Sequence, residues 1–139
     1  MAILADLQGP LSAYGDPLGE AFQLRDDVLG AFGEAAVTGK PVGDDLREGK
    51  PTPLLAIAVS RSSAPQMAVL AEVGQEDLTV EAVARIQEVM LATGALTEIE
   101  VTIDALTTEA IGAIGTAPIS PGACAALVDL AEFVAWRLT

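Results

Sequence analysis

The chain has 139 residues, the size of one ordinary domain that can bury a core of its own. It contains no histidine and a single cysteine, which excludes histidine-dependent catalysis, an intrachain disulfide and zinc or iron–sulfur clusters built from this chain alone. Twenty acidic residues against seven basic ones give a net charge of −13, which argues against nucleic acid as a partner. The remaining chemistry uses carboxylates, lysines, arginines and a hard metal ion.

Helix signals dominate the chain, because alanine is frequent and β-branched alternation is scarce. The first part predicts a helix at 3–13, a second helix that begins at Asp16-Pro17 and runs to about Ala31, and a long glycine-containing loop at 32–50. The second part predicts helices at 53–60, 63–73, 79–93 and 96–114, and a last helix from Ser120-Pro121. Its inward positions are predicted to be Cys124, Leu127, Val128, Ala131 and Val134, with Trp136 packing near its end. Seven helical segments predict a single all-α domain, a helical bundle, over residues 1–139.

No targeting or membrane segment is expected. The first 15 residues carry no basic residue and include Asp6, unlike a secretory signal. The longest uncharged stretch, 110–128, contains three glycines and two prolines and suits a helix–turn–helix junction better than a membrane span. A cytoplasmic protein is therefore expected.

Positive charge is concentrated in one segment of the chain. Four of the seven basic residues fall between residues 25 and 50. They are Arg25, Lys40, Arg47 and Lys50, and six acidic residues lie among them. Such a mixture suits a metal–phosphate complex, in which carboxylates hold Mg²⁺ and cations neutralise phosphate. The alternative is a solvated loop with alternating surface charges.

Helix geometry limits what the two adjacent aspartates can do. Neighbouring helical residues point about 100° apart, so Asp26 and Asp27 cannot both face one spot squarely. One carboxylate is expected to bind metal directly, and the other through water or by holding a neighbour. Gln23 lies between them on the helix, and Gly30 shares the face of Asp26. Phe22 is expected to line an apolar pocket beside this spot or to lie in the core.

Two glycine-bounded stretches carry a resemblance to a known family. Gly19-Glu-Ala-Phe-Gln-Leu-Arg-Asp-Asp-Val-Leu-Gly30 is followed by Gly39-Lys-Pro-Val-Gly-Asp-Asp-Leu-Arg-Glu-Gly-Lys-Pro-Thr52. Together they resemble the second aspartate-rich region of the trans-isoprenyl diphosphate synthases, the polyprenyl synthetase family, and are closest to actinobacterial geranylgeranyl-type members. The segments at 92–95 and 130–137 resemble the closing helices of the same family. The resemblance implies an all-α bundle that corresponds to the C-terminal part of the isoprenoid synthase fold.

The resemblance implies roles for individual residues. Asp26 would hold the Mg²⁺ that clamps an allylic diphosphate, and Asp27 would support it. Lys40 would contact the diphosphate, which makes Asp26, Asp27 and Lys40 the candidate catalytic residues. The implied substrate-binding residues are Phe22 and Gln23 on the isopentenyl diphosphate side, Lys40, Lys50 at the rim of the site, and Asp45 in the loop. The implied reaction is head-to-tail prenyl transfer between the two diphosphates.

The chain also departs from the family pattern. Gly30 stands where a third aspartate is common, and Pro51 stands where a basic or small residue is commoner. The first aspartate-rich motif of the family has no counterpart here, so the chain is expected to be the C-terminal half of such an enzyme and inactive alone. It is expected to form an oligomer or to associate with a complementary N-terminal half. The alternative is a non-catalytic remnant or helical interaction module that partners an intact prenyltransferase.

Overall fold

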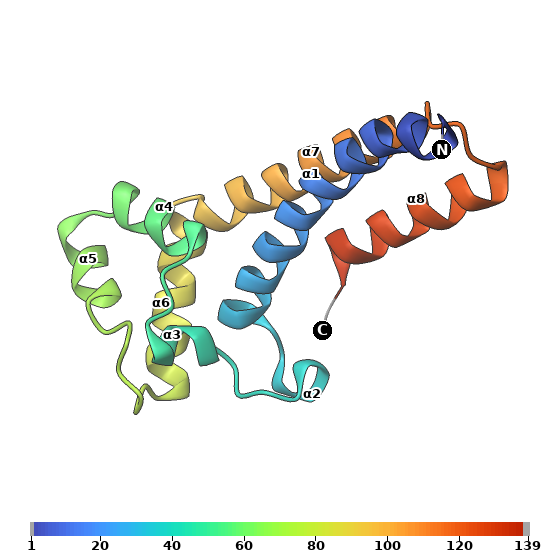
Figure 1. Ribbon diagram of the computed structural model, residues 1–139. Helices are drawn as coiled ribbons and strands as arrows, with labels where there is room; N and C mark the ends of the chain where they lie inside the picture. Colours follow the sequence, from blue (N-terminus) through green and yellow to red (C-terminus); the bar gives the residue numbers. More distant parts are fainter. Residues whose placement is uncertain (1, 138–139) are drawn as a thin grey trace. The chain divides into compact units, whose positions relative to one another are not determined.

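The computed structural model describes residues 2–137, and every regular element in that range is a helix (Figure 1). The helices, in chain order, are α1 (Ala2–Phe32), α2 (Ala35–Thr38), α3 (Asp44–Glu48), α4 (Pro53–Arg61), α5 (Ala64–Leu70), α6 (Val80–Ala92), α7 (Ala95–Ile114) and α8 (Pro121–Trp136). The prediction of an all-α protein is therefore confirmed.

The chain divides into two compact units. Of the described residues, the first unit comprises 2–25 and 101–137, and the second comprises 26–100. The boundaries between the units fall within α1 and within α7. That residues 1–139 form a single domain stays a prediction.

The first helix, α1, is continuous over 31 residues, although the sequence predicts two helices that meet near Gly15. Pro10 and Pro17 both lie inside it. A proline within a helix lacks the N–H that would bond four residues back, and costs about 3 kcal/mol. Tyr14 and Leu18 lie on either side of Pro17 and are buried in one apolar cluster. Burying each such side chain stabilises the fold by about 1.5–3 kcal/mol, so shared packing keeps the helix intact and the predicted start at Asp16-Pro17 is wrong.

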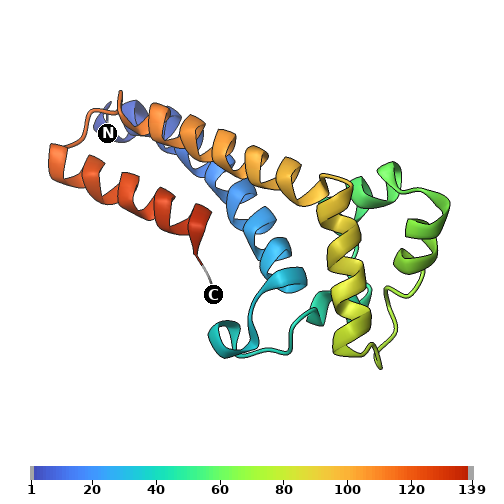
Figure 2. The ribbon, with the colours of Figure 1, turned by 180° about the vertical axis from the view of Figure 1, so that it is seen from behind.

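The core of the first unit joins residues from α1, α7 and α8 (Figures 1 and 2). Its buried members are Tyr14, Leu18, Ala110, Ile114 and Ala131, and the partly buried Cys124, Leu127, Val128 and Val134 pack against them. The predicted inward face of α8 is therefore confirmed. The Tyr14 hydroxyl donates a hydrogen bond of 2.7 Å to the Leu127 carbonyl. At the end of α8, Trp136 is half exposed rather than packed in the core, and the Arg25 guanidinium lies 4.9 Å from the centre of its ring.

In the second unit, α6 packs against α4 and α5. The helices α4, α5 and α6 begin within one residue of the predicted starts at 53, 63 and 79. Side chains of Thr52, Ser63 and Thr79 accept hydrogen bonds from their first turns and so cap them. The helix α5 ends at Leu70, three residues before the predicted end at 73. The chain turns there, and the Gly74 N–H donates a 2.8 Å hydrogen bond to the Leu46 carbonyl of α3.

The segment 32–50 is not the long loop that the sequence predicts, because it contains the short helices α2 and α3. Glycines that follow these helices, Gly39 and Gly49, have φ values of 74° and 71°. This left-handed conformation ends a helix and suits glycine, since it has no Cβ. Two of the glycines that suggested a loop, Gly39 and Gly49, therefore end short helices.

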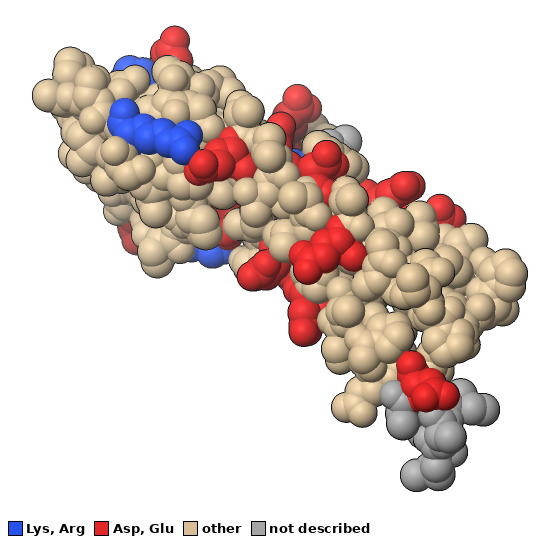
Figure 3. Space-filling model, turned by 90° about the horizontal axis from the view of Figure 1, so that it is seen from above, with Lys and Arg blue, Asp and Glu red and all other residues tan. Residues whose placement is uncertain are grey.

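No helix in the range 2–137 is long and apolar enough to cross a membrane. The uncharged stretch 110–128 forms the end of α7, a turn and the start of α8, as predicted. The excess of acidic over basic residues is visible on the molecular face in Figure 3, where Asp and Glu side chains are spread over the surface.

Candidate functional site

Four charged side chains meet in the second unit, where the end of α1 approaches α3. The Lys50 ammonium lies 3.2 Å from Asp27 Oδ1, 3.6 Å from Asp45 Oδ2 and 3.7 Å from Asp26 Oδ2. Asp26 and Asp27 belong to α1, Asp45 belongs to α3, and Lys50 follows α3 in sequence. The arrangement therefore joins three carboxylates from two helices around one cation.

The two aspartates of α1 occupy different environments. The side chain of Asp27 is 4% exposed, whereas that of Asp26 is 47% exposed. This difference fits the 100° offset of neighbouring helical positions. Both carboxylates nevertheless reach the same ammonium, because the long Lys50 side chain approaches from α3 rather than from their own helix.

Glycine at position 30 makes room for the third carboxylate. A Cβ built on Gly30 would overlap the carboxylate of Asp45. Gly30 lies one turn after Asp26 on α1, so Asp45 reaches this face of the helix only because the position has no side chain. The residue that departs from the family pattern thus permits a carboxylate from another helix to enter the same space.

The charge of Lys50 is stabilised by its neighbours. Partial burial on its own lowers the pKa of Lys50, but the hydrogen bond to Asp27 and the negative charges of Asp45, Asp27 and Asp26 together raise it above its ordinary value. Lys50 is therefore a permanent cation within this cluster at neutral pH.

The short helix α3 is held in place by backbone contacts. Arg47 donates hydrogen bonds to the carbonyls of Leu78 and Val42, at 3.1 Å and 2.6 Å. The guanidinium thus binds neutral carbonyl groups and fixes the turn that carries Asp45. Arg47 has a structural function in the second unit.

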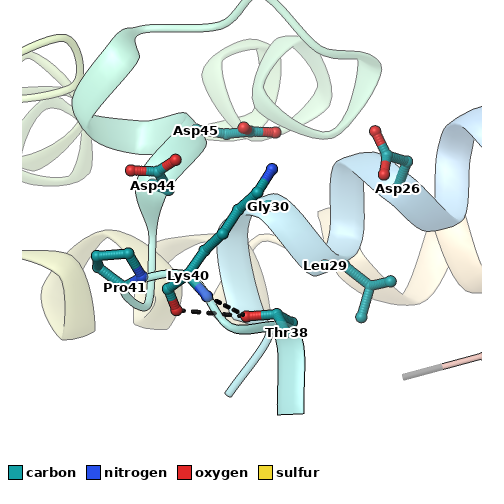
Figure 4. Close-up of a pocket in the computed structure, with 8 residues that line it drawn as sticks. All are labelled: Asp26, Leu29, Gly30, Thr38, Lys40, Pro41, Asp44 and Asp45. Carbon is teal, nitrogen blue, oxygen red and sulfur yellow. Dashed lines mark hydrogen bonds between the residues drawn. The ribbon is translucent and has the colours of Figure 1, made fainter. Parts of the chain in front are cut away.

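Lys40 lines a small cavity beside the charged cluster. The cavity has a volume of about 110 Å³ and is lined by Asp26, Leu29, Gly30, Thr38, Lys40, Pro41, Asp44 and Asp45. Figure 4 shows the Lys40 side chain extending toward Asp45, with Asp44 on one side and Asp26 on the other. The Thr38 hydroxyl accepts a 3.2 Å hydrogen bond from the Lys40 backbone N–H, which orders the chain at this position.

The donor groups of the cluster are those that a hard cation prefers. Three carboxylates supply oxygen ligands of the kind that bind Mg²⁺, and the ammonium among them shows that a cation is tolerated there. Within residues 2–137, no group of three or more such side chains already surrounds one point as a metal site would require. The carboxylate oxygens of the cluster are ligands of the type that binds a divalent cation, and in this structure they are arranged around the ammonium of Lys50.

Phe22 and Gln23 lie on the part of α1 that belongs to the first unit. Phe22 is exposed, with the Arg137 guanidinium 4.3 Å from its ring centre, so its interpretation as a core residue is wrong. Gln23 is also exposed. Arg25 is buried in the same unit and donates a hydrogen bond to the Ala135 carbonyl of α8.

Two features of the site were not predicted from the sequence. The contact between Gly30 and Asp45 joins residues 15 positions apart, and the only signal for it was a glycine inside an otherwise ordinary helix. Thr38 orders Lys40 through a local hydrogen bond that a Thr-Gly-Lys sequence makes possible.

Comparisons of the sequence and of the structure with known proteins both find synthases of prenyl diphosphates. The family model described as polyprenyl synthetase matches residues 1–90. An octaprenyl diphosphate synthase of Haemophilus influenzae is 42% identical over 80 residues, which are 58% of this chain and 24% of that protein. A geranylgeranyl diphosphate synthase of Mycobacterium tuberculosis is 51% identical over 55 residues, which are 39% of this chain and 16% of that protein.

Among solved structures, a geranylgeranyl pyrophosphate synthase of Corynebacterium glutamicum, crystallised with isoprenyl diphosphate and magnesium, superposes with a TM-score of 0.87 at 42% identity. The match covers 93% of this chain and 37% of that chain. The aligned region is thus well under half the length of each of these relatives. The matched family model covers well over half of this chain, and the chain belongs to the polyprenyl synthetase family.

Proposed function

We propose that this chain supplies the Mg²⁺- and diphosphate-binding part of a prenyltransferase that condenses isopentenyl diphosphate with an allylic diphosphate. The observation that carries the proposal is the convergence of Asp26, Asp27 and Asp45 on one cation beside the cavity that Lys40 lines. A site that binds a metal–diphosphate complex needs both carboxylates and a cation in this proximity.

In this proposal, carboxylates bind the metal ion and Lys40 binds the diphosphate. Asp26, which is half exposed, holds Mg²⁺, and the buried Asp27 supports it. The ion, when bound, supplies Lewis-acid stabilisation of the charge on the departing diphosphate. Lys40, which lines the same cavity as Asp26, donates to the diphosphate oxygens, and the acidic side chain of Asp45 is part of the polar lining.

Two further residues are proposed to face the second substrate. Phe22 and Gln23 would lie against isopentenyl diphosphate, with the aromatic ring beside its hydrocarbon part and the amide beside its polar part. In the reaction, the allylic carbon–oxygen bond to diphosphate breaks, the homoallylic double bond forms the new carbon–carbon bond, and a proton leaves. In this proposal, an apolar lining of the complete site excludes water from the allylic cation.

The proposal includes association with a complementary N-terminal part of the same family. Residues 1–139 carry one aspartate-rich motif, whereas the resemblance implies two. Large apolar side chains are exposed in both units, among them Leu130 and Phe133 on α8 and Val80 and Leu91 on α6. Such side chains are suited to packing against further helices.

An activity assay tests this proposal. The chain is incubated with an allylic diphosphate, isopentenyl diphosphate and Mg²⁺, alone and together with the N-terminal part of a relative. Product is expected only in the combined reaction, and Asp26→Ala is expected to lower its rate about a hundredfold or more. Asp104→Ala removes an exposed carboxylate of α7 and serves as the matched control. An unchanged rate with Asp26→Ala would contradict the assigned site.

The second candidate function is a non-catalytic helical interaction module. It is favoured by the lack, among residues 2–137, of three carboxylates already arranged for a metal. If this candidate is correct, neither product nor Mg²⁺-dependent diphosphate binding appears with or without the complementary part. The chain would instead co-purify with an intact prenyltransferase.

A further inference from the structure

Lys50 lies beside more carboxylates than Arg61 or Arg85 does. Among the ion pairs of the described residues, Arg61 pairs with Glu98 and Arg85 pairs with Glu72, each at an exposed site and each with one carboxylate. Lys50 pairs with three carboxylates, one of which is almost fully buried. Burying a carboxylate costs free energy that a nearby positive charge offsets, so the ammonium contributes to the stability of this cluster.

The backbone places the ammonium at this point. Gly49 has a φ of 71°, and a Cβ added to it would lie 3.0 Å from the Cα of Gly74. The close approach of these two glycines fixes the chain immediately before Lys50. The Lys50 N–H then donates a 3.1 Å hydrogen bond to the Asp45 carbonyl, so the residue that contributes one carboxylate also orients the lysine.

A divalent cation and the ammonium compete for the same oxygens. The carboxylate oxygens of Asp26, Asp27 and Asp45 lie 3.2–3.7 Å from the Lys50 nitrogen. Ligand oxygens lie about 2.0–2.1 Å from Mg²⁺, so a metal at this point leaves no space for the ammonium. Both cations also draw on the same local negative potential.

We propose that Lys50 is an internal counterion, which holds the carboxylates of Asp26, Asp27 and Asp45 together in the metal-free chain and is displaced when a divalent cation binds. This inference rests on the metal site of the proposed function and adds a regulating element to it. The released ammonium then projects toward the rim of the site, where it is available to an anionic substrate.

Cation titration of the 139-residue chain tests the displacement. Binding of Mn²⁺ is measured by calorimetry for the wild type, Lys50→Gln, Lys50→Arg and Arg85→Gln. The last variant removes the same charge at an exposed ion pair of α6 and so controls for the change in net charge. Lys50→Gln is expected to bind about tenfold more tightly than the wild type, the effect of losing about 1.4 kcal/mol of competing interaction. Lys50→Arg and Arg85→Gln are expected to stay within about twofold of the wild type.

Each outcome has a distinct meaning. If the wild type binds Mn²⁺ and Lys50→Gln binds equally or more weakly, the counterion inference is overturned and the proposed metal site stands. If Lys50→Arg binds as tightly as Lys50→Gln, the charge of Lys50 is not the cause and the inference is overturned. If no form binds the cation, the metal site of the proposed function fails, and displacement fails with it.

A chemical labelling experiment on the wild type gives a second test that needs no variant. The chain has two lysines, Lys40 and Lys50, and Arg47 lies between them, so trypsin separates them for mass spectrometry. Acetylation of Lys50 relative to Lys40 is expected to rise several-fold when Mg²⁺ is added, because the ammonium leaves its three carboxylates. An unchanged or lower ratio would overturn the inference.

Discussion

A missing side chain shapes the charged cluster at the scale of single residues. Gly30 lies in a helix, where alanine is intrinsically more stable by about 1 kcal/mol. The glycine is accounted for by the Asp45 carboxylate, which fills the space that a Cβ would need. The helix is thus intrinsically less stable at Gly30, the position where the carboxylates meet.

Substitution of Gly30 by alanine tests this explanation. Gly30→Ala is expected to push Asp45 away from Lys50, so the gain in helix propensity is offset by the lost ion pair. Gly19→Ala is the matched control, because Gly19 lies in the same helix with no atom within 4 Å of an added Cβ. In urea unfolding, Gly19→Ala is expected to stabilise the chain by about 0.5–1 kcal/mol, and Gly30→Ala to fall about 1–2 kcal/mol below it. Equal gains for the two variants would contradict the contact.

Tyr14 gives the first unit a dependence on alkaline pH. Burial raises the pKa of the Tyr14 hydroxyl, so the folded chain favours the neutral phenol. The stability that results is complete below the unfolded pKa of about 10 and is lost as the pH rises through the higher folded pKa.

The variant Tyr14→Phe separates this effect from that of other groups. It also loses the hydrogen bond to Leu127, so it is expected to be about 1 kcal/mol less stable near pH 8. Between about pH 8 and pH 11, its free energy of unfolding is expected to fall less than that of the wild type. Because the pKa of Lys50 is also raised, part of the alkaline loss remains in both proteins. Identical losses in the two proteins would rule out a contribution from Tyr14.

The sequence predicted which charged residues lie together better than it predicted their arrangement. The Asp-Asp, Gly-Lys and Gly-Lys motifs contain Asp26, Asp27, Asp45 and Lys50, and these four side chains do lie together. Helix angles within α1 could not foresee that Lys50 reaches both aspartates, because the lysine arrives from another element. The roles of Lys40, Phe22 and Gln23 toward substrates stay predictions.

At the scale of elements, several helix starts are predicted to within one residue. The helices α4, α6 and α8 begin within one residue of the predicted starts, and the side chains of Thr52, Thr79 and Ser120 accept hydrogen bonds from their first turns. The predicted helix boundaries are wrong where packing outweighs a local sequence signal, or where one residue type is compatible with two structures. Proline suggested a break in α1 that buried neighbours override, and glycines suggested a loop where they end the short helices α2 and α3.

The continuity of α1 leads to a prediction for Pro17. If the helix continues through this position, Pro17→Ala restores a backbone hydrogen bond and removes a clash, and the gain is partly offset by a more flexible unfolded chain. The variant is expected to be about 1–2 kcal/mol more stable in thermal or urea unfolding. If Pro17 instead began a separate helix, as the sequence suggested, replacement by alanine would leave stability unchanged or lower it.

At the scale of the whole molecule, family membership came from motifs spread over the chain and is confirmed by comparison. The residues of the charged cluster and of the cavity all lie within the second unit, residues 26–100. Cation binding by this cluster can therefore be measured with this chain alone, whereas prenyl transfer is proposed to need a complementary part. Composition could exclude histidine chemistry, but it could not distinguish a metal–diphosphate site from a solvated charged loop.

Calorimetric titration of inorganic diphosphate, with and without Mg²⁺, tests the central claim most directly. The wild-type chain is expected to bind diphosphate only when Mg²⁺ is present. Asp26→Asn and Asp27→Asn are each expected to weaken this binding about tenfold or more, while Asp104→Asn, a control on an exposed carboxylate of α7, leaves it unchanged. Binding that is independent of Mg²⁺, or that is equally strong in Asp26→Asn and Asp27→Asn, would contradict the account.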